Sequence, residues 1–139
     1  MTLGRTKNVD ILVSNPSTNQ LYQLEVKTNL DSRKRPSISK LFGRYLSDWI
    51  MDKKHESISR PELWYCFVTI GLETKIARYF ILPSSVVSEY VRDQHRLWLK
   101  MKPKVKDTSM RLFRIGFKEE DYRIFTPTVE QYEDNWEFK

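Results

Sequence analysis

Cysteine, histidine and glycine are scarce in this sequence of 139 residues, which contains one, two and four of them respectively. A single cysteine, Cys66, excludes an intrachain disulfide, and too few cysteines and histidines are present for a zinc-ligand pattern. The glycines form no glycine-rich phosphate loop. Because Cys66 lies in an apolar run, we expect a reducing, cytoplasmic setting.

Long apolar runs are also absent. The longest extends from Leu63 to Leu72, contains Thr69 and is too short to cross a bilayer as a helix. Residues 1–7 lack the apolar stretch of a signal peptide. We therefore expect neither a targeting segment nor a membrane partner.

Basic residues exceed acidic ones by 24 to 18, which gives a formal net charge of +6. Such a charge fits a polyanionic partner such as DNA, although proteins that bind no nucleic acid also reach it. With 40% hydrophobic residues the chain is long enough for one core and too short for two. We expect one domain over residues 1–139.

The segment from Val9 to Thr28 carries the most informative pattern. Val9–Val13 is a short apolar run interrupted by Asp10, which is typical of a buried strand. Residues 15–19 are turn formers, and Leu21–Lys27 reads as a second strand. The simplest pairing of the two strands is an antiparallel hairpin.

Alternation along the second strand places Glu25 and Lys27 on the same face, and the hairpin brings Asp10 near Glu25. Two carboxylates at close range need a cation, and oxygen ligands suit a hard ion such as Mg²⁺ or Mn²⁺. We expect Asp10, Glu25 and the Val26 backbone carbonyl to be its ligands. Lys27 would then lie beside a metal-bound water.

Asp10 at the head of one strand, followed by Glu25 and Lys27 on the next, resembles the signature of the PD-(D/E)xK nuclease superfamily, with Val9 in place of the leading proline. Tyr79–Ser84 and Trp136 resemble small prokaryotic members of this superfamily. The resemblance implies a restriction-endonuclease-like α/β fold with a mixed central sheet flanked by helices. It also implies an Mg²⁺-dependent endodeoxyribonuclease with catalytic Asp10, Glu25 and Lys27.

Members of this superfamily usually carry a helix before the Asp strand, and the sequence shows none. Three explanations stay open: the chain starts late, the site works with fewer ligands, or a partner subunit or second copy covers the flank. The alternative function is a non-catalytic DNA-binding or assembly module that retains the nuclease fold. Glu25 and Lys27 alone also fit an ordinary surface ion pair.

Basic residues gather in two further segments, Arg33–Arg35 and Lys100–Lys106. We expect these segments, together with one side of a helix predicted over residues 39–54, to contact the DNA backbone without reading its sequence. The predicted contact residues are Arg33, Lys34, Arg35, Lys40, Arg44, Lys102, Lys104 and Lys106.

The rest of the chain alternates strands and helices. The sequence predicts a buried central strand over 63–70, a further strand over 76–82, and a helix capped by Ser84 or Ser85 that ends at Pro103. Alternation over 111–117 predicts a half-exposed edge strand with Arg111 and Arg114 facing outward. A last helix is expected over 129–136, docked by Tyr132 and Trp136. The two histidines, His55 and His95, are expected at the surface.

Overall fold

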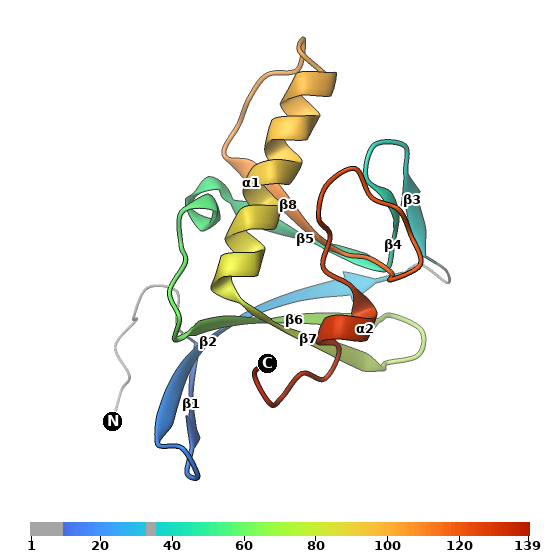
Figure 1. Ribbon diagram of the computed structural model, residues 1–139. Coiled ribbons are helices and arrows are strands. Elements are labelled where there is room, and N and C mark those ends of the chain that lie inside the picture. The colour runs from blue at the N-terminus through green and yellow to red at the C-terminus, as the bar shows by residue number, and fades with distance from the viewer. Residues whose placement is uncertain (1–9, 33–35) are drawn as a thin grey trace.

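The computed structural model describes residues 10–32 and 36–139, and these form a mixed α/β fold (Figure 1). The strands are β1 (Ile11–Asn15), β2 (Gln20–Asp31), β3 (Ser37–Ser39), β4 (Gly43–Tyr45), β5 (Ser47–Asp52), β6 (Leu63–Gly71), β7 (Ala77–Pro83) and β8 (Met110–Ile115). The helices are the 3₁₀ turn η1 (Lys53–Glu56), the long helix α1 (Ser84–Met101) and the short helix α2 (Val129–Tyr132).

The central sheet has four strands in the order β1-β2-β6-β7. β1 and β2 form an antiparallel hairpin, β2 and β6 run parallel, and β6 and β7 are antiparallel. The predicted mixed sheet and the predicted hairpin are therefore confirmed. The parallel pair is joined by β3, β4, β5 and η1, whereas the sequence predicted a helix in this connection.

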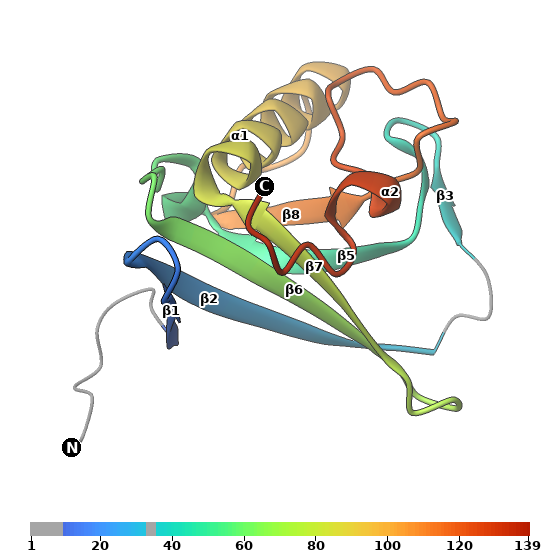
Figure 2. The same ribbon diagram turned by 60° about the horizontal axis from the view of Figure 1, so that its bottom comes forward.

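β6 is the central strand, as predicted, and its residues from Leu63 to Thr69 are all buried. The apolar run of β6 suits a strand that is covered on both faces. One face packs against α1 and the antiparallel pair β5–β8, which lie on the same side of the sheet (Figure 2). This main core is built from aromatic rings, and Phe113 of β8 stacks on Phe67 of β6 with ring centroids 4.1 Å apart.

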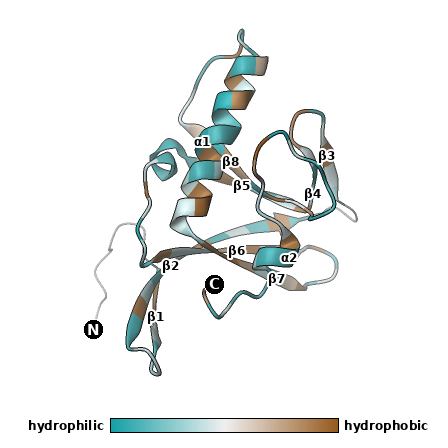
Figure 3. Ribbon diagram, in the orientation of Figure 1, coloured by the Kyte–Doolittle hydropathy of each residue, from teal (hydrophilic) through white to brown (hydrophobic). Residues whose placement is uncertain are grey.

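The other face of the sheet is covered more thinly. Leu24, Trp64 and Ile81 form a second cluster on this face, and Phe138 from the C-terminal segment packs against it. The Phe138 ring stacks on Tyr22 at 4.5 Å. Figure 3 shows the hydrophobic colouring of β6 at the centre of the molecule. The C-terminal segment thus substitutes for a helix on this face.

The helix predicted over residues 39–54 is wrong, because this segment forms β3, β4, β5 and η1. Gly43 has a φ of +79°, a left-handed backbone conformation that breaks a helix. In β5, Ser47, Trp49 and Met51 are buried while Ile50 is exposed. This period of two is that of a strand, and it coexists with the helical spacing of the apolar residues.

Three smaller predictions also need correction. The first strand is exposed rather than buried, since Ile11 and Leu12 are 47% and 49% exposed. The residue that caps α1 is Pro83, and neither Ser84 nor Ser85 makes a capping hydrogen bond. The last helix ends at Tyr132, and Trp136 is half exposed.

The predicted exposure of β8 is likewise wrong, because Arg111 and Arg114 are both buried. Arg111 lies on the same side of the strand as Phe113, within the main core, whereas Arg114 lies on the opposite side beneath Phe42 and Tyr45. Both faces of this strand are therefore covered. Within residues 10–32 and 36–139, no helix has the length and apolar character needed to cross a membrane.

The aromatic stack that joins β8 to β6 should carry much of the stability. We expect Phe113→Ala to lower the free energy of unfolding by about 3–5 kcal/mol, because it opens a cavity in a closely packed core. Ile50→Ala is the matched control, since Ile50 lies in the same strand pair and is 71% exposed. It should change stability by about 0.5 kcal/mol or less. Urea denaturation measures both, and equal effects would contradict the assigned core.

Candidate functional site

Glu25 and Lys27 point to the same face of β2, as predicted, and the Lys27 Nζ lies 3.0 Å from Glu25 Oε1. In the parallel register they lie beside Tyr65 and Phe67 of β6, on the side of the main core. Glu25 is only 5% exposed. The pair is therefore not an ordinary surface ion pair, because its carboxylate has been removed from water.

The two oxygens of the Glu25 carboxylate have different surroundings. Oε1 binds Lys27, whereas Oε2 is buried and makes no hydrogen bond of ordinary geometry with the described residues. The Tyr65 hydroxyl lies close enough for a hydrogen bond with this carboxylate to contribute, after burial and the charge of Glu25, to the raised pKa of Tyr65. An ionised carboxylate in such a position costs free energy unless donors or a cation compensate it.

Behind Glu25 lie two buried polar rings. His55 of η1, 1% exposed, is hydrogen bonded through Nδ1 to the Tyr65 hydroxyl at 2.8 Å. Burial, and then the negative charge of Glu25, raise the pKa of Tyr65. Burial lowers the pKa of His55 below its usual 6.5, the charge of Glu25 opposes this shift, and that of Lys27 adds to it. Both rings are therefore neutral near pH 7.

Asp10 lies at the open end of the hairpin and is exposed, so the prediction of a buried carboxylate is wrong. Its Oδ2 accepts a hydrogen bond of 2.8 Å from the Val26 backbone N–H, and its own N–H donates to the Leu24 carbonyl. The register pairs Ile11 with Leu24. Asp10 therefore comes just before the first paired residue of β1, and its backbone lies opposite Glu25 of β2. The Asp10 carboxylate thus accepts the Val26 N–H bond that a backbone carbonyl would accept if β1 continued as a paired strand.

The Val26 carbonyl was predicted as the third metal ligand. In an extended strand the N–H and C=O of one residue point to the same edge, so this carbonyl faces the edge on which Asp10 lies. Carboxylate and carbonyl oxygens are the ligands that Mg²⁺ or Mn²⁺ prefers, and a cation held by Asp10, Glu25 and this carbonyl stays a prediction. The part of the chain that the structure describes has no group of three or more histidine, cysteine or carboxylate side chains able to hold a metal ion.

Lys27 opens into a cleft of about 420 Å³ between β2 and β5. Asn29 fixes one wall, because its Nδ2 donates to the Ser47 hydroxyl at 2.9 Å and to the Asp48 carbonyl. Asp31 and Asp48 also line the cleft. Lys27 is therefore the part of the buried pair that reaches solvent, with 29% of its side chain exposed.

The basic residues predicted to contact DNA have different environments. Arg33, Lys34 and Arg35 lie outside the described residues. Lys102, Lys104 and Lys106 are exposed between α1 and β8, and Lys40 is exposed between β3 and β4. Lys40 and Lys102 line one cleft, so the structure brings together two segments that are distant in sequence.

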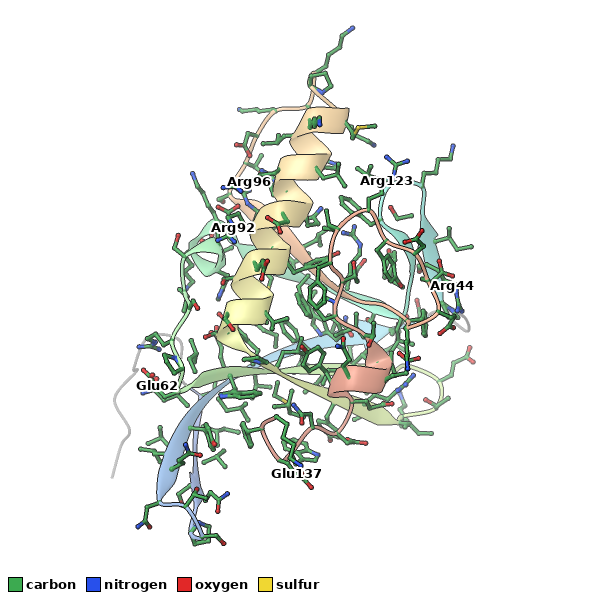
Figure 4. All side chains as sticks on the ribbon, in the orientation of Figure 1. Arg44, Glu62, Arg92, Arg96, Arg123 and Glu137 are labelled. Carbon is green, nitrogen blue, oxygen red and sulfur yellow. The ribbon has the colours of Figure 1, made fainter. Side chains whose placement is uncertain are left out.

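Arg44 differs from these lysines because its charge is already neutralised. Its guanidinium binds Glu119 at 2.7 Å and Glu120 at 3.2 Å and lies over the Phe117 ring. Figure 4 labels Arg44 on the side of the molecule where β3 and β4 lie. A phosphate would have to compete with two carboxylates for this side chain.

Several buried polar residues were not anticipated from the sequence. His55 and His95 were expected at the surface, and both are buried, His95 with Nε2 2.8 Å from Asp107. The charged surroundings of His55 in the sequence concealed its burial, because a four-residue 3₁₀ turn directs one side chain inward. The residues around His55 in the sequence do not indicate that Tyr65 is its hydrogen-bond partner.

A larger cavity, of about 600 Å³, lies elsewhere, in the segment between β8 and the C-terminus. Phe117, Tyr122 and Gln131 are among its lining residues. It contains none of the residues that the sequence pattern singled out, so the site described above is defined by its side chains rather than by the size of its cleft.

A scan against models of protein families gives no match, and searches of curated proteins and of solved structures give none either. The similarity to PD-(D/E)xK nucleases thus depends on the motif residues alone. It stays a prediction.

His55 should make stability depend on pH. Because its pKa is lowered in the folded protein, the unfolded chain binds the proton more readily once the pH falls below 6.5. The stability contributed by neutral His55 is complete above this pH and is lost as the pH falls further. We expect His55→Gln to lose less unfolding free energy than the unchanged protein between about pH 7.5 and about pH 5. Parallel curves from urea titrations would contradict this.

Proposed function

We propose that the protein is a metal-dependent nuclease that hydrolyses DNA phosphodiester bonds at the site formed by Asp10, Glu25 and Lys27. The observation that carries this proposal is the buried carboxylate of Glu25, which is paired with Lys27 through one oxygen and makes no hydrogen bond of ordinary geometry at the other, beside the Tyr65 hydroxyl. A divalent cation at this second oxygen would complete the surroundings of the buried carboxylate.

The ligand set supports Mg²⁺ or Mn²⁺ as the cofactor. Asp10 uses one carboxylate oxygen for the Val26 N–H, which leaves the other for a cation, and Glu25 Oε2 and the Val26 carbonyl add two more oxygens. Mg²⁺ usually keeps several waters and takes only one or two carboxylates from a protein. The bound ion would supply a water of lowered pKa and polarise the scissile phosphate.

Lys27 is placed to act on the phosphate. Its ammonium group is held by Glu25 and extends into the cleft between β2 and β5. A cation fixed in advance stabilises the negative charge that grows on the phosphate oxygens during attack. Since Glu25 would hold both the metal and Lys27, a single buried carboxylate would align the two positive charges.

The substrate proposal follows from charge. The chain carries a formal net charge of +6, and Lys40, Lys102, Lys104 and Lys106 are exposed. Such lysines bind the phosphate backbone in a sequence-independent and salt-dependent way. The proposed partner is therefore DNA contacted through its backbone, with Arg44 contributing only if it leaves Glu119 and Glu120.

A second candidate function is a DNA-binding or assembly module that retains the architecture without turnover. The hydrogen bond between Asp10 and Val26 favours it, because this contact explains Asp10 as a cap of the sheet edge without any metal. The described chain offers no group of three or more histidine, cysteine or carboxylate side chains for a metal ion. The two candidates differ in metal binding and in cleavage, and each difference can be measured separately.

Cleavage of DNA should depend on Lys27. We expect Lys27→Ala to reduce Mg²⁺- or Mn²⁺-dependent nicking of plasmid DNA by about 10²-fold or more, while DNA affinity at fixed salt changes little. Lys75→Ala is the control, since Lys75 is exposed in the turn between β6 and β7. Absence of nicking by the unchanged protein on duplex, single-stranded and branched DNA would support the second candidate instead.

Metal binding should stabilise the fold through Glu25. We expect Mn²⁺ to raise the midpoint of thermal unfolding of the unchanged protein, because a ligand that binds only the folded state stabilises it. Glu25→Gln should remove this response. Glu89→Gln, an exposed carboxylate on α1, should retain it. An equal response in all three proteins would exclude Glu25 as a ligand.

A further inference from the structure

Arg114 of β8 is a buried cation without a carboxylate. The residue is 7% exposed, and its guanidinium lies over the Phe42 ring at 4.5 Å and the Tyr45 ring at 5.1 Å. Its Nε and Nη1 are buried and donate no hydrogen bond to the described residues. The two rings favour a positive charge, but they supply no acceptor for these donors.

The other buried arginine of the same strand shows what a satisfied guanidinium looks like here. Arg111 donates through Nε to Glu56 at 2.7 Å and through Nη1 to the carbonyls of Thr108 and Met110. Arg111 thus has the partners that a structural arginine requires. Arg114, three residues further along, has none of this kind.

Neighbouring polar groups do not supply Arg114 with a charged partner. Asp48 faces Arg114 in the β5–β8 register, yet no ion pair joins Arg114 to a carboxylate of the described chain. The Tyr90 hydroxyl is also buried and makes no hydrogen bond of ordinary geometry with the described residues. Burial raises the pKa of Tyr90 to about 12, and the charge of nearby Arg114 acts in the opposite direction. A hydrogen bond with Arg114 also lowers the pKa of Tyr90, so the uncharged Tyr90 hydroxyl is the acceptor nearest to this buried cation, and no carboxylate of the described chain pairs with it.

Arg114 opens into the cleft that also contains Lys40 and Lys102. This cleft measures about 420 Å³, and Phe42 and Trp98 supply aromatic surface in it. Its lining residues belong to 39–42, α1 with its C-cap, and β8, and none of them lines the Lys27 cleft. The Arg114 cleft is thus a separate place in the fold, and three positive side chains from three segments converge on it.

We propose that the Arg114 cleft binds a phosphate group. A guanidinium presents parallel donors that match phosphate oxygens, and two further lysines favour a group that carries close to two negative charges over a carboxylate that carries one. Phe42 and Trp98 offer surfaces for a base or sugar attached to that phosphate. The guanidinium would thereby gain an anionic acceptor, which the described part of the chain does not provide.

Two sources of phosphate fit this chemistry, free inorganic phosphate and the terminal phosphate of a nucleic-acid strand. Isothermal titration calorimetry without divalent metal separates them, using inorganic phosphate and two oligonucleotides that differ only in a 5′-phosphate or 5′-hydroxyl. Tighter binding of the phosphorylated strand identifies a strand end as the ligand. Equal binding of both strands, together with saturable binding of inorganic phosphate, identifies the free ion.

The variants decide whether the cleft is responsible. We expect Arg114→Met to abolish phosphate binding and Lys40→Ala or Lys102→Ala to weaken it by about tenfold or more, whereas Lys75→Ala, in the turn between β6 and β7, leaves it unchanged. Lys40 and Lys102 are exposed, so their variants keep the test valid if Arg114→Met does not fold. Phosphate binding that is absent, or unaffected by both lysine variants, would overturn the proposal. The result is independent of cleavage, because Lys27→Ala should bind phosphate normally.

Discussion

The parallel pairing of β2 with β6 is the constraint on which the rest of the structure depends. It places Glu25 beside Tyr65 and Lys27 beside Phe67, and thereby moves both charges from the surface of a hairpin to the margin of the main core. A lone hairpin would leave this pair in water, where it would contribute little. Because β6 is buried on both faces, the carboxylate next to it must be compensated, and Lys27 and the Tyr65 hydroxyl are the described groups that face it.

Features set by local pattern could be predicted from the sequence. The turn formers after Asn15 indicated the hairpin, and strict alternation put Glu25 and Lys27 on one face. An unbroken apolar run marked β6, and apolar residues at helical spacing marked α1. The helix predicted over residues 39–54 was wrong because the spacing of the apolar residues there is compatible both with a helix and with a set of short strands. The left-handed conformation of Gly43 and the alternating burial of Ser47, Trp49 and Met51 favour the strands over the helix. Both features depend on tertiary contacts, which the sequence alone does not show.

The environment of the candidate site could not be predicted, because burial of a charged side chain depends on partners that are distant in sequence. His55 meets Tyr65 across ten residues, whereas Arg111 meets Glu56 across fifty-five. Alternation correctly separates Arg111 from Arg114 on β8, but it cannot say that both faces are covered. The outward orientation predicted for both arginines assumed an edge strand with one solvated face, and Phe42 and Tyr45 cover that face.

Glu25 and Arg114 are two buried charges of opposite sign whose hydrogen bonding within the described chain is incomplete. Glu25 has one oxygen and Arg114 has two nitrogens without a hydrogen bond of ordinary geometry, and tyrosine hydroxyls are their uncharged neighbours. The clefts that contain Lys27 and Arg114 share no lining residue. If only stability mattered, pairing them or replacing them by apolar side chains would be favourable. The cost of leaving both incomplete is instead explained if each is completed by a ligand, a cation at Glu25 and a phosphate at Arg114. Under the two proposals, DNA and its metal would supply both.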